Sequence, residues 1–120
     1  MELLNSLAKI YPTLQVVIGT VAVTGGTPSL SQLSGEADFD QTQVSIADNG
    51  TGDFTITVSN FRGQQGYLAG LATGTTISNM VSCTAQSYTA GTDDANFTFK
   101  VEDDASAAAD NGFNFILAAF

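Results

Sequence analysis

Histidine and tryptophan are absent from the 120-residue sequence, and cysteine occurs once, at Cys83. The lack of histidine excludes Ser-His-Asp and Cys-His catalysis and every histidine-ligated metal site. A single thiol cannot close a disulfide within the chain, and Cys83 has no histidine to activate it, so we interpret it as a small buried hydrophobe. We therefore expect a protein that is not an enzyme and that has no catalytic residues, no metal and no cofactor.

Basic residues are also scarce. Lys9, Arg62 and Lys100 stand against twelve acidic residues, which gives a formal net charge of −9. Phosphate backbones and anionic lipid surfaces would repel such a chain, so we expect neither a nucleic acid nor a membrane as partner. The apolar run over residues 16–18 is far shorter than a membrane span, and the first ten residues lack a basic signal-peptide region. We expect synthesis in the cytoplasm.

Two groups of polar residues leave alternatives open. Asp93 and Asp94, and the stretch 102–104 with Asp110, offer oxygen ligands for calcium. Their spacing matches no EF-hand loop, and aspartate is common at loop tips for turn formation alone, which we favour. Three tyrosines offer rings for stacking on a sugar: Tyr11, Tyr67 and Tyr88. Buried edge positions are the more usual role of such isolated tyrosines.

From residue 15 onward, short runs of β-branched and aromatic residues alternate with polar ones between turn-forming residues. The clearest signal is a hairpin over residues 43–58, where Val44 and Ile46 precede the loop 48–52 and Phe54 begins a second alternating run. We also expect a strand pair flanking the turn-like residues 73–76. This pattern predicts an all-β domain, a single antiparallel β-sandwich or jelly roll.

The last eight residues, 113–120, are apolar on both faces after Asn114. Such a run is typical of a central strand that is covered on both sides, or of one whose outer side is sealed by a neighbouring subunit. We expect an oligomer interface here, formed by Phe113, Phe115, Leu117 and Phe120.

The first residues differ from the rest. Apolar side chains recur there at steps of three and four, which indicates one face of a short helix or an ordered arm that Pro12 ends. They are Leu3, Leu4, Leu7, Ile10 and Tyr11. So short a helix is marginal alone in water and needs a surface to dock on, either its own domain or a partner. We therefore divide the chain into an N-terminal arm, residues 1–14, and a sandwich domain, residues 15–120.

Three segments, taken in order, resemble jelly-roll domains of bacteriophage virion proteins: residues 25–30 (GGTPSL), residues 44–58 with the loop NGTGD, and residues 110–116 (DNGFNFI). This family includes capsid decoration, or cement, proteins and tail-fibre tips. The resemblance covers roughly residues 19–120. It implies a jelly-roll fold and a homotrimer.

The resemblance and the separate apolar arm together favour a non-enzymatic capsid decoration protein. We expect it to be assembled in the host cytoplasm and to bind the major capsid protein on the outer surface of a phage head, with the five apolar arm residues making the contact. The alternative is a tail-fibre tip or receptor-binding domain that recognises carbohydrate. The absence of any catalytic constellation places an enzyme last.

Overall fold

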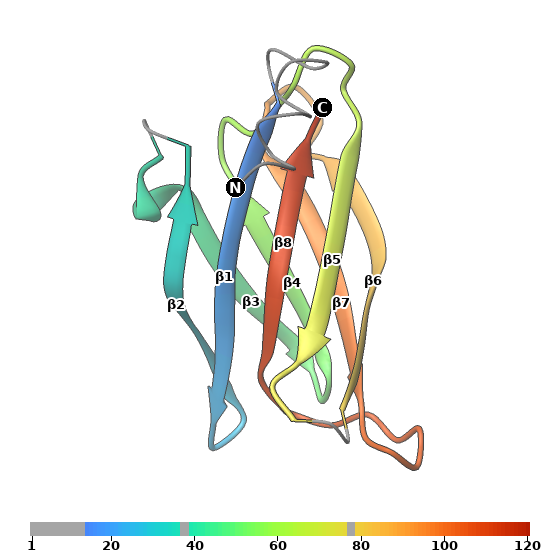
Figure 1. Cartoon of the computed structure of the whole chain (residues 1–120). Coiled ribbons are helices and arrows are strands. Elements are labelled where there is room, and N and C mark those ends of the chain that lie inside the picture. The colour runs from blue at the N-terminus through green and yellow to red at the C-terminus, as the bar shows by residue number, and fades with distance from the viewer. Residues whose placement is uncertain (1–13, 37–38, 77–78) are drawn as a thin grey trace.

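The computed structural model describes residues 14–36, 39–76 and 79–120. Within these ranges the chain forms eight strands and one 3-10 turn. In chain order they are β1 (Gln15–Thr24), β2 (Thr27–Gly35), η1 (Gln41–Gln43), β3 (Val44–Gly50), β4 (Asp53–Val58), β5 (Leu68–Gly74), β6 (Met80–Tyr88), β7 (Ala95–Glu102) and β8 (Phe113–Ala119). The strands build two layered antiparallel sheets, so the predicted β-sandwich is confirmed (Figure 1).

The strand order shows how the chain winds around its core. The first sheet has the order β2-β1-β8-β5 and the second sheet has the order β3-β4-β7-β6. The first and last strands pair, from Gln15 opposite Ala119 to Val21 opposite Phe113, and β4 pairs with β7 in the other sheet. These antiparallel pairs place the first and last strands side by side in the first sheet. The predicted C-terminal strand is β8, and its central position is confirmed because it lies between β1 and β5.

The predicted hairpin is formed by β3 and β4, with Val44 opposite Val58 and Ile46 opposite Ile56. Its loop contains Gly50 and Gly52, whose φ angles are 131° and 67°. A side chain at Gly52 would be strained by this backbone, and its Cβ would also lie 2.5 Å from the carbonyl oxygen of Val101. The prediction of this hairpin from its alternation and its loop composition is confirmed.

The predicted pairing across residues 73–76 is wrong. The strands on either side, β5 and β6, belong to different sheets, where they pair with β8 and β7. They meet across the sandwich instead: a Cβ atom on Gly70 would lie 2.9 Å from Cys83 Sγ. The turn-like composition is correct, but this connection crosses between the layers, which a local sequence pattern does not distinguish from a hairpin.

Alternating side chains fill the space between the sheets. Phe54, Phe97, Phe99 and Phe113 are fully buried, and the rings of Phe99 and Phe113 lie 5.2 Å apart between centroids. Among the described residues, no polar or charged side chain is buried with them. The core formed by the described residues is therefore apolar.

Candidate functional site

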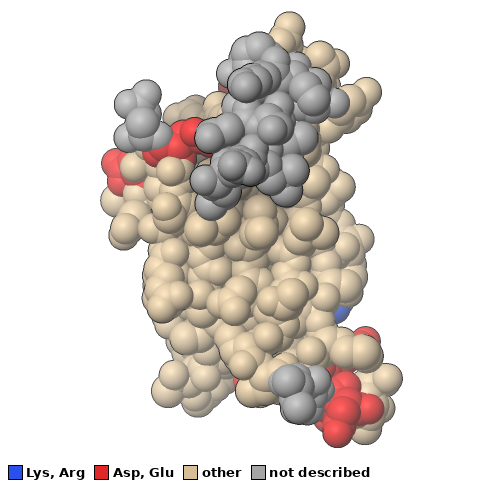
Figure 2. Space-filling model, in the orientation of Figure 1, with Lys and Arg blue, Asp and Glu red and all other residues tan. Residues whose placement is uncertain are grey.

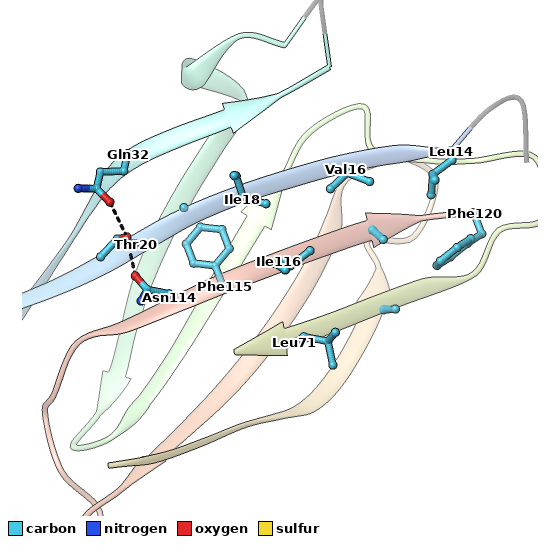
Figure 3. A pocket seen from close by; sticks show the side chains of 13 residues that line it. Leu14, Val16, Ile18, Thr20, Gln32, Leu71, Asn114, Phe115, Ile116 and Phe120 are labelled. Carbon is cyan, nitrogen blue, oxygen red and sulfur yellow. Dashed lines mark hydrogen bonds between the residues drawn. The ribbon is translucent and has the colours of Figure 1, made fainter. Parts of the chain in front are cut away.

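The outer face of the first sheet carries an apolar groove of about 650 Å³. It runs over β1, β8 and β5, and Figure 3 shows its lining from close by. The lining residues are Leu14, Val16, Ile18, Gly19, Thr20, Gln32, Ala69, Leu71, Asn114, Phe115, Ile116, Ala118 and Phe120. No ionisable side chain is among them. The volume falls within the range of ligand pockets, but the site is an open groove on a sheet face.

The apolar character of this face follows from the strand pattern. Ile18 and Ile116 occupy opposing positions on β1 and β8, and Leu71 lies opposite Ile116 on β5. All three point away from the core. Ile116 is 47% exposed and Leu71 is 68% exposed. A sheet face that meets water normally carries polar side chains at such positions, so these residues mark a surface that another apolar group would cover.

The floor of the groove depends on a close approach between Gly19 and the Phe115 ring. Gly19 on β1 pairs directly with Phe115 on β8, and a Cβ atom on Gly19 would lie 2.6 Å from the Phe115 ring and 2.6 Å from Leu33. The absence of a side chain at Gly19 therefore lets the Phe115 ring lie across β1. We expect any larger residue at position 19 to displace this ring.

Three polar side chains close one end of the groove. Thr20 Oγ1 lies 2.7 Å from Asn114 Oδ1 and 3.2 Å from Gln32 Oε1 (Figure 3). A hydroxyl has one proton and donates to one of these oxygens, so the other amide completes the row by turning its NH₂ group toward Thr20. Gln32 reaches this row from a bulge in β2, where its φ is 54°. The row brings no charge to the groove.

The predicted oligomer-interface residues lie in two different environments. Phe113, Phe115 and Leu117 are buried in the sandwich core, so their assignment to a subunit interface is corrected: alternation along β8 turns them inward. Phe120 is half-buried and lines the groove. The outward position that sequence reasoning missed is Ile116, and its signal was the apolar run on both faces of residues 115–119. Whether the chain forms an oligomer stays a prediction.

The predicted contact residues of the arm, Leu3, Leu4, Leu7, Ile10 and Tyr11, lie outside the described residues. Of the arm, the structure describes Leu14, which lines the groove at the start of β1.

Three of the acidic residues considered for calcium accept hydrogen bonds from other groups of the chain. Asp93 accepts a hydrogen bond from Arg62 Nε at 2.8 Å. Asp103 accepts from two backbone N–H groups of its own loop, and Asp110 accepts from the N–H of Gly52 at 2.8 Å. In the described part of the chain, no three acidic or cysteine side chains gather in a way that would hold a metal ion.

Two further candidates, Tyr88 and Cys83, are built into the second sheet. The guanidinium of Arg62 lies 3.9 Å from the centre of the Tyr88 ring, and the Tyr88 hydroxyl donates to the carbonyl of Phe61 at 3.0 Å. One ring face is thus already covered. Burial raises the pKa of the Tyr88 hydroxyl and also that of the Cys83 thiol, which lowers the fraction of reactive thiolate. Tyr67, by contrast, is 67% exposed.

Comparisons with protein-family models, curated proteins and solved structures found no match. Over residues 14–36, 39–76 and 79–120, no helix has the length and hydropathy needed to cross a membrane. The groove on the outer face of the first sheet is the candidate site.

Proposed function

We propose that this chain is a non-enzymatic structural protein of a virion, a capsid decoration protein that binds and stabilises a phage head shell as an oligomer. The observation that carries the proposal is the apolar outer face of the first sheet. A sandwich that worked alone in water would have no use for such a face, whereas an assembly protein requires one. The proposed partner is the major capsid protein on the outer surface of the shell.

The distribution of charge supports docking on a protein surface. Acidic side chains gather toward the two ends of the sandwich, and the broad face between them is neutral (Figure 2). A neutral face can meet another protein without the cost of desolvating charges. The three polar side chains at the end of the groove bond to one another, so they too can be covered without losing their partners.

A small-molecule enzyme site is less well supported. The groove lining contains no acid, base or thiol, and the core beneath it is apolar. Catalysis needs titratable or nucleophilic groups positioned around a substrate. The face is suited to binding by shape and apolar contact alone.

The proposed oligomer is a homotrimer, as the jelly-roll resemblance implies. Its subunit interface would use the outward-facing side of β8 around Ile116, because the residues first expected at the interface face the core. Light scattering of the intact chain at tens of micromolar gives the mass. We expect three chains. A sharp monomer mass would remove the trimer and leave a protein that associates only on the shell.

The shell contact is tested by sedimenting the protein with expanded empty head shells of its source virus. Leu71→Asp places a charge in the groove on an exposed strand, so we expect retention on the shells to fall at least tenfold with an unchanged melting temperature. Ser45→Asp introduces the same charge on the exposed outer face of β3 and should leave retention unchanged. Equal retention of both variants would contradict docking through the groove, and no retention of the parent chain would contradict the decoration role.

The receptor-binding alternative would use exposed aromatic rings. Tyr67 is such a ring, whereas Tyr88 has one face occupied by Arg62. Binding to a glycan array, lost in Tyr67→Ala, would favour this alternative over shell docking.

A further inference from the structure

We propose that Asn49 is a site of spontaneous covalent modification in the folded protein, where its side-chain amide is converted through a succinimide ring into aspartate and isoaspartate. The site lies at the tip of the hairpin formed by β3 and β4, at one end of the sandwich (Figure 1). The modification does not depend on the proposed binding to a head shell.

The reaction joins the asparagine side chain to the residue that follows it. The backbone nitrogen of Gly50 forms a bond to the side-chain carbonyl carbon of Asn49 and gives up its proton. The bond from that carbon to Nδ2 breaks, and the amide group leaves with this proton as ammonia. Water then adds to one of the two ring carbonyls and opens the ring. One opening gives aspartate, and the other gives isoaspartate, in which the main chain runs through the side-chain carbon.

The residue after the asparagine controls access to the ring. A side chain on that residue hinders the attack of its backbone nitrogen, so glycine, which has no Cβ, is the most permissive neighbour. Asn49 and Asn111 precede glycine, whereas the other five asparagines precede serine, methionine or phenylalanine. The chain therefore offers two candidate pairs, and their surroundings distinguish them.

The Asn49–Gly50 pair has room to change its conformation. Both residues are exposed, and a Cβ atom on Gly50 would have no heavy atom within 4 Å. Asn49 is also the extra residue of a bulge, because the register of β3 against β4 shifts between Asp48 and Gly50. A bulged residue has no direct partner on the opposite strand, so its rotation disturbs the ladder less than rotation of a paired residue.

Side-chain hydrogen bonds restrain this pair at an exposed site. Asn49 Nδ2 donates to Thr55 Oγ1 at 2.8 Å and to Asp53 Oδ1 at 3.3 Å. The N–H of Gly50 donates to Asp48 Oδ1 at 2.9 Å. Exposed hydrogen bonds contribute little net free energy, because water replaces them when they break. We therefore expect these bonds to slow the reaction without preventing it.

The Asn111–Gly112 pair is fixed by its surroundings. Asn111 Nδ2 donates to Asn79 Oδ1 at 2.9 Å in a partly buried position, and the Asn111 N–H donates to the carbonyl of Ala109 at 3.0 Å. A Cβ atom on Gly112 would lie 2.5 Å from the carbonyl oxygen of Val21 in β1. The backbone that would have to rotate for ring closure is therefore packed against a strand. We expect this pair to react only when the chain unfolds.

The modification changes the hairpin tip. Aspartate or isoaspartate at position 49 loses the Nδ2 donor to Thr55 and Asp53. It also adds a carboxylate beside those of Asp48 and Asp53, and like charges at short range repel. The modified protein thus carries one more negative charge, and we expect its hairpin tip to be less stable.

Peptide mapping by mass spectrometry tests the proposal. The intact protein is incubated at mildly alkaline pH, and the peptides with Asn49 and Asn111 are followed over weeks, with electron-transfer fragmentation to distinguish isoaspartate from aspartate. We expect Asn49 to be converted several-fold faster than Asn111, with isoaspartate among its products. In urea, where the chain is unfolded, the two rates should become similar. Conversion of Asn49 in the folded protein that is no faster than that of Asn111, or that yields no isoaspartate, would overturn the proposal.

Two matched variants assign the reacting residue. Asn49→Gln lengthens the side chain by one carbon, which disfavours ring closure, and should remove the mass gain and the acidic charge variant of the incubated protein. Asn111→Gln makes the same change at the packed pair and should leave both unchanged. A mass gain that persists in Asn49→Gln, or disappears in Asn111→Gln, would place the modification elsewhere and contradict the assignment to Asn49.

Discussion

The two sheets of the sandwich share a core and differ on their outer faces. The second sheet presents a polar ladder between β4 and β7: Thr57 Oγ1 donates to Asn96 Oδ1 at 2.8 Å, and Lys100 donates to Asp53. The first sheet presents the apolar side chains Ile18, Ile116 and Leu71 at corresponding positions. The second sheet therefore presents polar side chains on its outer face, whereas the first sheet presents apolar ones.

Strands β4 and β8 show this difference in their sequences. In β4, buried Phe54, Ile56 and Val58 alternate with threonine, so one face is core and the other is polar. In β8, the buried residues alternate with Asn114, Ile116 and Ala118, so the outer face becomes apolar after the first position. Both strands are central in their sheets. The position of a strand in its sheet therefore does not determine the polarity of its outer face.

The largest expected effect is a loss of stability on substitution in the core, compared with a substitution in the groove. Phe99 is fully buried between the sheets, and Phe99→Ala should lower the free energy of unfolding by about 3–5 kcal/mol, the usual loss for a buried phenylalanine. Ile116→Ala on the outward side of β8 should cost about 1 kcal/mol or less, because this side chain is 47% exposed. Urea unfolding followed by circular dichroism measures both values. Similar losses would show that the outer face of β8 is as well packed as the core.

Much of the fold follows from local patterns in the sequence. The alternation of Phe54, Ile56 and Val58 identifies both the strand and its buried face, and the glycine-containing loop before it identifies the hairpin. What local patterns do not contain is the partner of each strand. The connection between β5 and β6 has a turn composition but crosses between layers, because pairing with β8 and β7 decides where each strand lies.

The groove could be predicted only in part. The run at residues 115–119 indicates that β8 is covered on both faces, but it does not say which of Phe115 and Ile116 points outward. That assignment depends on register: Phe115 lies opposite Gly19, which leaves room for its ring on the inner side. The meeting of Ile18, Ile116 and Leu71 on one face also depends on pairing between strands that are far apart in the sequence.

A smaller effect is expected on the polar face. Thr57→Val removes the hydroxyl that donates to Asn96, and we expect a loss of about 0.5–1.5 kcal/mol in the free energy of unfolding. A double-mutant cycle with Asn96→Ala isolates the pair. A coupling energy near zero would show that water replaces this hydrogen bond at no cost, and that the ladder serves solubility rather than stability.

The smallest expected effect on stability comes from the charged pair in the polar ladder. The groove lining has no charged residue for comparison. The hydrogen bond from Lys100 holds the pKa of Asp53 below its ordinary value of 3.8. The depressed pKa means that the pair stabilises the fold fully above about pH 4 and ceases to do so as the pH falls through the folded value. Asp53→Asn should therefore cost about 0.2–1 kcal/mol at pH 7, as for other exposed pairs, and less at pH 2, because the carboxyl becomes protonated as the pH falls. Thr20→Val, beside the groove, involves no ionisable group and should change stability equally at both pH values. Urea unfolding at the two pH values measures both variants, and a loss for Asp53→Asn that was equally large at pH 2 would assign its effect to packing instead of charge.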